Sequence, residues 1–539
     1  MMTSAPRPDA HAPGAHTLGR WPTDRARLHP HRVAIVDRGV ELTYQGLDER
    51  AEALAASLTR AGYRRGDRVA TLVGNGAEHV ITFFACARTG LVLVPLSWRL
   101  TAPELADQLT QSDPSLLLVE EMTETLARGA LSRVPAGIPT AQIGQVGVEQ
   151  PVPAPWHGGS DLGPTLDEAG PVRDEDPLLM VFTSGSSARP KAAVLTHASC
   201  FWTNLSLSRT LELDETDIVL SVLPQFHVGG WNIQPLLAWW TGATVVLERS
   251  FDPGRALCLI AEHKITTMMG VPTHYARLAE HPSFERTDLS ALRSAVVGGA
   301  PMPAPLLRIF HAHGVALTQG YGLTEAGPNV LCVPPREAME RVGWAGVPYP
   351  HVEVRLADPA TGEHLEGPCT GELLVRGPGM FAGYFRDEAA TRAIWRDGWL
   401  ATGDVAVRDE AGYLKIVDRL RNIYITGGEN VAPAEVEAAL RTHPAVEDVA
   451  VVGVPDDRWG ESGIALVVRR SGVVTDEAEL VEHCRERLAA FKVPAGVHFV
   501  SELPYNALGK VARQDALRVA LEVTDRAPVA AEQRDGGMP

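Results

Sequence analysis

Lysine is nearly absent from this chain of 539 residues. Only Lys191, Lys264, Lys415, Lys492 and Lys510 occur, so arginine supplies 44 of the 49 basic residues. The two cations are not interchangeable, because an ammonium is a compact point charge and a guanidinium is a planar fork of donors. Each retained lysine is therefore a candidate for a role that arginine does not fill.

Positive charge is also in deficit, with 49 basic against 66 acidic residues and a net charge of −17. This balance argues against a large nucleic-acid or anionic-membrane footprint, which needs a basic surface, and leaves a local basic cleft open. The six cysteines form no CxxC pair, which argues against a disulfide framework and a thiolate metal site. No run approaches the roughly 18 apolar residues of a membrane span, and the N-terminus lacks the apolar core of a signal peptide. A cytoplasmic location is expected.

Short β-branched runs alternate with helical patterns from about residue 32, as at residues 33–36, 69–73 and 91–94. Between the first two runs, apolar residues recur on one face of a helix over residues 47–58. Such alternation predicts a largely parallel, doubly wound α/β sheet. Residues 130–172 contain seven prolines, so an irregular connection is expected there.

The pattern changes near the C-terminus to short strands at residues 446–454, 464–468 and 497–500. One helix is opened by Thr475 and Asp476. We expect an N-terminal domain over residues 25–420, a small α+β domain over 421–520, and loose tails at 1–24 and 521–539.

A loop rich in hydroxyls and small residues, TSGSSARPKAAVLTH (residues 183–197), follows an apolar run. Backbone N–H groups, hydroxyls and one ammonium in a tight loop suit a polyphosphate. The loop is not of the Walker type, because no glycine precedes Lys191 and no Ser or Thr follows it. A polar hairpin turn is the alternative. The candidate phosphate-binding residues are Thr183, Ser184, Gly185, Ser186, Ser187 and Lys191.

Further motifs follow in a specific order: LPQFHVGG (223–230), VGGAPMP (297–303), QGYGLTEA (319–326), GELLVRG (371–377), DGWLATGDV (397–405), VDRLRNIYITGGENVAPAEVE (417–437) and ELPYNALGKVAR (502–513). The series resembles the adenylate-forming superfamily, specifically its acyl-CoA synthetases, over about residues 30–518. The resemblance implies a large N-terminal domain of doubly wound sheets with a β-barrel-like subdomain, and a small mobile C-terminal α+β domain. It also implies a reaction in which a carboxylate takes AMP from ATP, releasing pyrophosphate, before the thiol of CoA displaces AMP.

By this resemblance, Asp404 accepts hydrogen bonds from the ribose hydroxyls and Tyr321 lies against adenine. Thr324 faces phosphate and Glu325 binds Mg²⁺, with a helix N-cap for Thr324 and a first-turn acid for Glu325 as the alternatives. The remaining implied nucleotide-binding residues are Gly298, Gly299, Ala300, Pro301, Gly320, Gly322 and Arg419.

Lys510 matches the family's mobile catalytic lysine, where a point charge stabilises the transition state of adenylation. Lys492 matches a family position with a structural or CoA-phosphate role. Lys264 and Lys415 match no motif and are expected to be solvated.

The resemblance also implies that the small domain rotates after adenylation. Arg421 stands at the hinge, and Gly427, Gly428 and Glu429 line the CoA tunnel. His227 matches a gate between that tunnel and the acyl pocket, and is implied to be catalytic. The implied acyl pocket comprises His227, Val228, Gly229, Trp231 and Val297, with packing as the alternative for His227 and Trp231.

The phosphate loop departs from the family pattern, because Ala188 and Ala192 replace two glycines. A Cβ at a glycine position with positive φ costs about 1–2 kcal/mol. We therefore hold two hypotheses open: an enzyme that forms thioesters but adenylates weakly or not at all, and an ordinary two-step ligase.

The expected substrates are ATP with Mg²⁺, or an acyl adenylate, together with CoA and a hydrophobic carboxylic acid. A non-catalytic adenylate-binding protein and a luciferase-like oxygenase are the less favoured alternatives. A homodimer, and a separate adenylating enzyme as partner, stay open. No nucleic acid and no stable membrane anchor are expected.

Overall fold

The computed structural model describes residues 14–135, 137–157, 165–166, 168–183, 190–300, 302–426, 429–456, 459–505 and 510–526. The chain forms two compact units. The large unit comprises Met1–Arg355, Leu374–Thr402 and Asp409–Lys415, and the small unit comprises Leu356–Leu373, Gly403–Arg408 and Ile416–Pro539.

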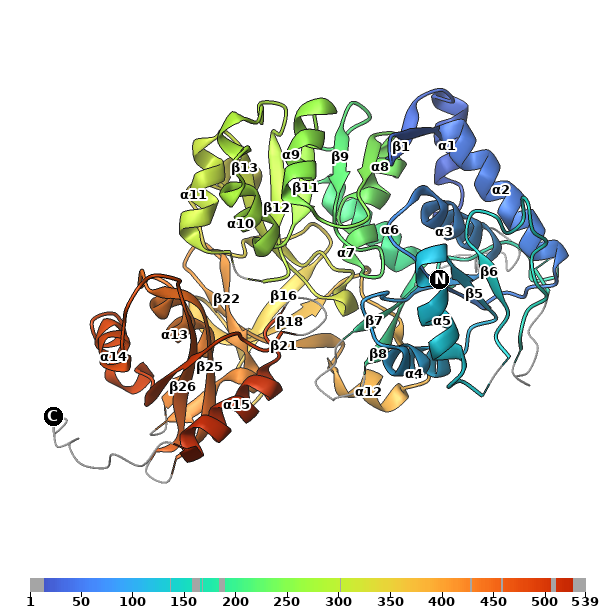
Figure 1. Cartoon of the computed structure of the whole chain (residues 1–539). Helices are drawn as coiled ribbons and strands as arrows, with labels where there is room; N and C mark the ends of the chain where they lie inside the picture. Colours follow the sequence, from blue (N-terminus) through green and yellow to red (C-terminus); the bar gives the residue numbers. More distant parts are fainter. Residues whose placement is uncertain are drawn as a thin grey trace, which may run out of the picture. The chain divides into compact units, whose positions relative to one another are not determined.

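A nine-stranded sheet in the large unit has the order β15-β14-β13-β12-β11-β9-β10-β1-β2 (Figure 1). Its strands are β1 (Val33–Asp37), β2 (Val40–Thr43), β9 (Ile218–Ser221), β10 (Thr244–Leu247), β11 (Thr267–Gly270), β12 (Ser294–Val297), β13 (Ala316–Tyr321), β14 (Leu331–Cys332) and β15 (Val347–Pro348). The pairings from β1 through β13 are parallel. Their burial on both faces agrees with the runs of apolar residues in the sequence.

A seven-stranded sheet in the same unit has the order β19-β8-β7-β4-β3-β5-β6. Its strands are β3 (Arg68–Leu72), β4 (Val92–Pro95), β5 (Leu116–Val119), β6 (Thr140–Gln142), β7 (Pro177–Thr183), β8 (Lys191–Thr196) and β19 (Gly383–Tyr384). Parallel pairs β4·β7, β3·β4, β3·β5 and β5·β6 confirm the predicted doubly wound pattern. The strand β6 lies inside the segment that the sequence predicts to be irregular.

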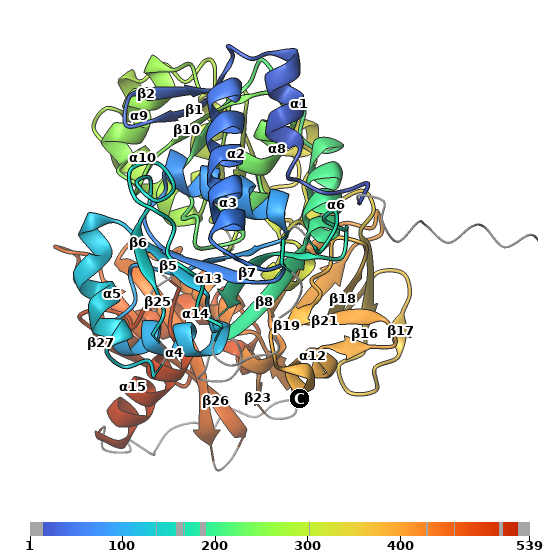
Figure 2. The same cartoon turned by 90° about the vertical axis from the view of Figure 1, so that its right-hand side faces the viewer.

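Helices of the large unit connect these strands, and Figure 2 shows α2 and α3 side by side. They are α1 (Trp21–Leu28), α2 (Tyr44–Arg60), α3 (Ala77–Thr89), α4 (Ala102–Ser112), α5 (Glu124–Leu131), α6 (His197–Ser208), α7 (Gly229–Asn232), α8 (Pro235–Thr241), α9 (Pro253–Glu262), α10 (Pro272–Glu280), α11 (Ala304–Ala312) and α12 (Glu388–Ala393), with short 3₁₀ turns η1 (Glu121–Thr123), η2 (Phe284–Arg286), η3 (Thr324–Ala326) and η4 (Pro335–Glu337). The large buried core includes Trp231 and Trp239, both 0% exposed.

A six-stranded sheet has the order β17-β16-β18-β21-β20, with β22 paired to β21. Its strands are β16 (Glu353–Ala357), β17 (His364–Leu365), β18 (Cys369–Arg376), β20 (Trp395–Arg396), β21 (Trp399–Arg408) and β22 (Leu414–Arg419). The chain passes from one unit to the other within β16, β18, β21 and β22.

The small unit contains a five-stranded sheet of order β24-β23-β26-β25, with β27 parallel to β26. Its elements are η5 (Leu420–Asn422), β23 (Tyr424–Thr426), β24 (Glu429–Val431), α13 (Pro433–Leu440), β25 (Val446–Asp456), β26 (Gly460–Arg469), α14 (Glu477–Arg485), η6 (Ala490–Lys492), β27 (Gly496–Val500) and α15 (Arg513–Arg526). Asp476 caps α14 by accepting a hydrogen bond from the Glu479 backbone N–H, as its position before the helix predicts.

Two described segments, residues 14–24 and 521–526, fall within the tails that the sequence predicts to be loose. Residues 14–24 were expected to be loose, yet Leu18 is 0% exposed and the His16 ring lies 2.7 Å from the Asp174 carboxylate. At the other end α15 continues to Arg526, past the expected boundary at residue 521. Tertiary packing explains the first difference, because Leu18 and Trp21 are buried in the hydrophobic core of the large unit.

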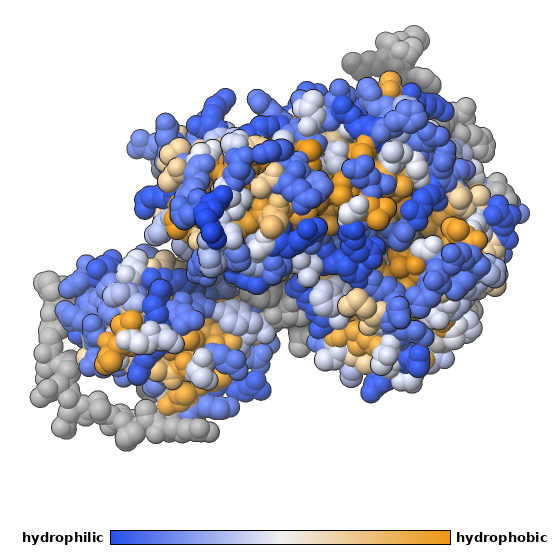
Figure 3. All heavy atoms as spheres, turned by 45° about the horizontal axis from the view of Figure 1, so that its top comes forward, coloured by the Kyte–Doolittle hydropathy of each residue, from blue (hydrophilic) through white to orange (hydrophobic). Residues whose placement is uncertain are grey.

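The molecular surface carries hydrophilic residues interleaved with apolar ones on the face shown in Figure 3. Exposed apolar residues such as Val40, Met122 and Val474 lie far apart in the chain. Across the residues described, we find no helix long and apolar enough to cross a membrane.

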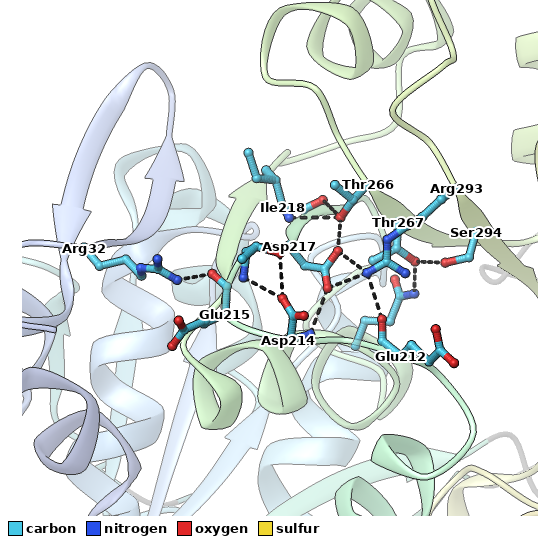
Figure 4. Close-up of polar contacts among 12 residues, drawn as sticks. Arg32, Glu212, Asp214, Glu215, Asp217, Ile218, Thr266, Thr267, Arg293 and Ser294 are labelled. Atoms are coloured by element: carbon cyan, nitrogen blue, oxygen red, sulfur yellow. Dashed lines mark hydrogen bonds and ion pairs between the residues drawn. The ribbon is translucent and has the colours of Figure 1, made fainter. Parts of the chain in front are cut away.

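A charged network ties the amino ends of three adjacent parallel strands together (Figure 4). The carboxylate of Asp217, before β9, is 2% exposed and lies 2.5 and 2.6 Å from Arg293 Nη2. Thr266, before β11, donates a hydrogen bond of 2.5 Å to the same carboxylate. Since the carboxyl ends of these strands lie at the opposite edge, the network is expected to serve stability.

Replacing Asp217 by asparagine is expected to lower the free energy of unfolding by about 2 kcal/mol, because hydrogen bonds to a charged group are lost. Urea denaturation of the full chain measures this change. Asp288→Asn is the matched control, since Asp288 and its partner Lys264 are exposed at the surface. An unchanged midpoint for Asp217→Asn, or equal shifts for both variants, would contradict a structural role for the network.

Candidate active site

The motif segments of the large unit leave the carboxyl ends of neighbouring parallel strands. Residues 223–230 follow β9, residues 298–300 follow β12, and β13 ends at Tyr321. In register, Val297 pairs with Gln319 across β12 and β13. Open parallel sheets bind ligands at this edge, so the fold brings these candidate residues to one place.

Close backbone packing explains two of the glycines at this edge. A Cβ on Gly322 would lie 1.4 Å from the carbonyl oxygen of Pro328, which no side chain tolerates. A Cβ on Gly298 would lie 3.3 Å from the carbonyl oxygen of Gly320 and 2.9 Å from Met269 Cε. Tyr321 is half-buried between these segments, whereas Gly299 and Ala300 are exposed. Pro301 lies outside the described residues.

A cluster of four side chains lies at the phosphate loop. They come from the start of the loop, the end of the loop, η3 and β19. Glu325 Oε1 accepts a hydrogen bond of 2.7 Å from the Tyr384 hydroxyl and lies 3.5 Å from Thr183 Oγ1. Lys191 Nζ stands 5.0 Å from the centroid of the Tyr384 ring. Thr324 precedes Glu325 in the same half-buried turn. An ammonium, hydroxyls and a carboxylate therefore meet where the sequence predicts phosphate and Mg²⁺.

Tyr384 was missed by the sequence reasoning. It lies in β19, which pairs with β8 at the edge of the seven-stranded sheet. Burial raises the pKa of its phenol, and the negative charge of Glu325 raises it further. The phenol therefore stays protonated and holds the Glu325 carboxylate. Only the pairing of β19 with β8 brings it there, so no local motif identifies it.

Ala192 occupies an ordinary strand position. It pairs with Phe182 across β7 and β8, is 4% exposed, and is not among the non-glycine residues with positive φ. Its carbonyl accepts a hydrogen bond of 2.8 Å from the Phe385 backbone. The predicted strain at residue 192 is therefore wrong, because a methyl group there packs into the core. Ser184, Gly185, Ser186, Ser187 and Ala188 lie outside the described residues.

Trp231 packs as a core residue. Its ring is 0% exposed and stacks on Phe83 with centroids 4.8 Å apart, and its Nε1 donates to the Gln225 carbonyl at 2.6 Å. These contacts favour the packing alternative for Trp231 over a place in the acyl pocket. His227 is half-buried with its ring 4.6 Å from Phe226. Of the remaining acyl-pocket candidates, Val228 and Val297 are buried and Gly229 is half-buried.

In the small unit, Asp404 lies in β21 and Arg419 ends β22. Arg419 Nε donates a hydrogen bond of 3.1 Å to Asp404 Oδ1, whose carboxylate is almost fully buried. The guanidinium itself is about half exposed. The pair therefore presents a carboxylate and a cation side by side, as ribose and phosphate recognition requires.

The pKa of Lys510, an exposed residue before α15, is shifted by the charges of both Arg419 and Asp404. Partial desolvation by neighbouring atoms lowers the pKa of its ammonium, and the charge of Arg419 lowers it further. The Asp404 carboxylate acts in the opposite direction. The small unit thus holds all three predicted residues close enough to interact electrostatically.

The segment after β22 is tied to α13 by Asp418, which is 8% exposed. Its carboxylate accepts hydrogen bonds from the Arg419 backbone at 2.6 Å, from Asn422 Nδ2 at 2.9 Å and from the Ala434 backbone at 2.9 Å. Arg421 lies in η5 between these contacts, and Glu429 begins β24. Gly427 and Gly428 lie outside the described residues.

The other lysines form surface contacts. Lys492 Nζ lies 2.7 Å from Glu435 Oε1, and Lys264 Nζ lies 2.8 Å from Asp288. Lys415 is exposed, as expected. Lysine is scarce in this chain, and Lys191 and Lys510 are the two lysines whose surroundings contain other site candidates.

No group of three or more His, Cys, Asp or Glu residues within the described ranges is arranged to hold a metal ion. A single carboxylate such as Glu325 nevertheless fits Mg²⁺ carried by a nucleotide, because that ion takes one or two protein carboxylates and completes its shell with phosphate and water. The residues present therefore fit an ion that arrives with ATP.

Comparison with known proteins accounts for this arrangement. A family described as "AMP-binding enzyme" matches residues 23–385, and "AMP-binding enzyme C-terminal domain" matches residues 435–510. Feruloyl-CoA synthase of Amycolatopsis sp is 42% identical over 505 residues, covering 93% of this chain and 98% of its own. Indoleacetate–CoA ligase of Aromatoleum aromaticum is 36% identical, covering 94% of this chain and 99% of its own.

Solved structures give the same result. O-Succinylbenzoate CoA synthetase of Bacillus subtilis, in complex with its acyl-adenylate intermediate OSB-AMP, matches with a TM-score of 0.80 and 30% identity over 96% of this chain and 99% of that chain. Both the predicted fold class and the predicted reaction class are confirmed. The chain belongs to the AMP-binding enzyme family of adenylate-forming proteins and is an acyl-CoA ligase.

Proposed function

We propose that this ligase joins an aromatic or similarly hydrophobic acid to CoA in two steps, with ATP and Mg²⁺ in the first. The observation that carries the proposal is the cluster of Thr183, Lys191, Glu325 and Tyr384 at the phosphate loop. The named acids of the two relatives, feruloyl and indoleacetate, are both aromatic and support the substrate class.

Each side chain has a task in this proposal. Lys191 neutralises phosphate charge, and Glu325 binds the ion that arrives with the nucleotide. That ion, when bound, offsets the charge on the phosphates. The Asp404 carboxylate accepts hydrogen bonds from the ribose hydroxyls, and Arg419 orients the Asp404 carboxylate. Lys510 stabilises charge as the acid's carboxylate oxygen attacks the α-phosphorus and pyrophosphate leaves.

We further propose that both steps run in this chain. The ordinary strand geometry of Ala192 removes one of the two reasons to expect weak adenylation. The alternative now rests on Ala188 alone.

A paired assay decides between the two. Pyrophosphate release from ferulic acid with ATP reports the first step, and thioester formation from synthetic feruloyl adenylate with CoA reports the second. We expect both products. Ala188→Gly should change pyrophosphate release less than about fivefold, since a tolerated alanine costs under about 1 kcal/mol. Thioester formation without pyrophosphate release, restored by Ala188→Gly, would contradict the proposal. Inactivity in both assays would exclude this substrate class.

Removing the Tyr384 hydroxyl tests the cluster itself. Tyr384→Phe deletes the 2.7 Å hydrogen bond to Glu325 and leaves the ring beside Lys191. Loss of a group that orients a metal ligand typically weakens metal binding about 10–100-fold. We expect the Mg²⁺ concentration for half-maximal pyrophosphate release to rise about tenfold. Thioester formation from the adenylate should not change, and an unchanged Mg²⁺ dependence would show that Tyr384 plays no part.

A further inference from the structure

A small buried cavity lies in the large unit, on one face of the nine-stranded sheet. Its volume is about 10 Å³, room for a single water molecule. The walls come from β9, β11 and the segments of α7 and α8. They are Val219, Leu220, Ser221, Val222, Leu223, Gly229, Gln234, Pro235 and Met269. None of these residues is charged.

Two polar atoms in this wall have no hydrogen-bond partner among the residues the structure describes: Ser221 Oγ and Gln234 Oε1. Ser221 is 5% exposed and Gln234 is 1% exposed. Leaving a polar group buried and unpaired costs about 1–3 kcal/mol, so native structures rarely retain one without a reason. Both residues line the same cavity, which has room for one small polar group to pair with them.

The side-chain amide of Gln234 is fixed by a hydrogen bond to a neighbouring strand. Its Nε2 donates a hydrogen bond of 2.9 Å to Thr267 Oγ1, which also accepts one of 3.1 Å from Ser294 Oγ. Figure 4 shows Thr267 and Ser294 joined in this way. In the structure Nε2 is the amide atom that contacts Thr267, and Oε1 is the amide atom without a partner among the residues described.

Met269 lines the cavity and also lies next to Gly298 of the candidate active site. It pairs with Ser221 across β11 and β9, and its Cε lies 2.9 Å from the position of a Cβ on Gly298. Its strand partner Val296 precedes Gly298 by two residues, which places the cavity roughly 7 Å inward from the ligand-binding edge. A methionine side chain is unbranched and flexible, so a change of its rotamer connects the two spaces.

We propose that Ser221 and Gln234 recognise a hydroxyl group at the far end of the acid, and that Met269 moves aside to admit it. The inference rests on the proposed function. A hydroxyl accepts a hydrogen bond from Ser221 Oγ and donates one to Gln234 Oε1, so it satisfies both atoms. An ether oxygen cannot donate, and a second charge finds no counter-ion in this wall. The preferred substrates are therefore hydroxylated aromatic acids.

The test compares cinnamic, 4-hydroxycinnamic and 4-methoxycinnamic acids by kcat/KM for thioester formation with ATP and CoA. We expect the 4-hydroxy acid to exceed cinnamic acid by about tenfold or more, because a site built to bind a hydroxyl rejects the analogue that lacks it. Ser221→Ala and Gln234→Met should each reduce that ratio several-fold. Met269→Ala should favour the bulkier 4-methoxy acid relative to wild type.

Ser294→Ala is the matched control. It also removes a hydrogen bond from the group that includes Thr267, but Ser294 does not line the cavity. We expect its ratio of 4-hydroxycinnamic to cinnamic acid to equal that of the wild type. A general loss of packing would lower kcat/KM for all acids together, whereas loss of recognition changes the ratio.

Equal kcat/KM values for the three acids would overturn the inference, and the cavity would then hold a water molecule only. A preference that survives both Ser221→Ala and Gln234→Met would overturn it too. If no acid turns over, binding of the sulfamoyl-adenosine analogues of cinnamic and 4-hydroxycinnamic acid separates the two proposals. Tenfold tighter binding of the hydroxylated analogue would support the cavity's role while the function fails, and equal binding would overturn the role.

Discussion

Replacing Lys510 by alanine is expected to lower pyrophosphate release by about 10²–10³-fold, the usual effect of removing one donor that stabilises transition-state charge. Thioester formation from a synthetic adenylate should change little, because the α-phosphate is already joined to the acid in that step. The two half-reactions are measured separately, as pyrophosphate and as thioester. Lys492→Ala is the matched control, since Lys492 pairs with Glu435 at the surface and should leave the first step intact.

The pH dependence of the first step follows from the lowered pKa of Lys510. A lowered pKa means that the ammonium loses its proton at a lower pH than an ordinary lysine does. Pyrophosphate release should therefore fall on the alkaline side below pH 10.5, the ordinary value for lysine. Equal losses in both half-reactions for Lys510→Ala, or an unchanged first step, would contradict its assignment to adenylation.

Replacing Asp404 by alanine is expected to impair both half-reactions by about 10²–10³-fold, in contrast to Lys510. The ribose is present in ATP and in the acyl adenylate alike, and hydrogen bonds to a charged group contribute about 1.5–3 kcal/mol each. The loss should appear in kcat/KM for ATP and for the synthetic adenylate.

A matched change at Asp418 serves as the control. Asp418 is also buried in the small unit, but its carboxylate binds Arg419 and Ala434 backbone groups and Asn422. Asp418→Asn should lower stability in urea while retaining affinity for an AMP analogue. If Asp404→Ala binds that analogue as tightly as wild type, the ribose role fails.

Local patterns in the sequence predicted several elements of the fold and the reaction class. The alternation of apolar runs predicted the strands β1, β3 and β4 to within one residue at each end. It predicted the helix α2 to within three residues at its start and two at its end. The order of motifs indicated the reaction class, because phosphate, ribose and lysine recognition each depend on a few contiguous residues. Composition drew attention to all five lysines, and the motifs selected Lys191 and Lys510 among them, whereas Lys264, Lys415 and Lys492 lie at the surface.

Strand pairing decided the features that the motifs do not contain. Tyr384 holds Glu325 from 59 residues away because β19 pairs with β8. The same sheet shows Ala192 as an unstrained strand residue, although its motif suggested a damaged loop. Register, and not residue type, determined both outcomes.

Burial decided the rest. The position of Trp231 implied the acyl pocket or core packing, and its contacts with Phe83 and Gln225 are those of a core residue. Ser221 and Gln234 carry no sequence signal, and only their placement around one cavity leaves two polar atoms to be satisfied. The sequence by itself determined the family, the reaction class and the residues of the nucleotide motifs. The tertiary structure decided which of them touch and which buried polar atoms of the described residues have no partner, because hydrogen bonding and burial depend on neighbours that are distant along the chain.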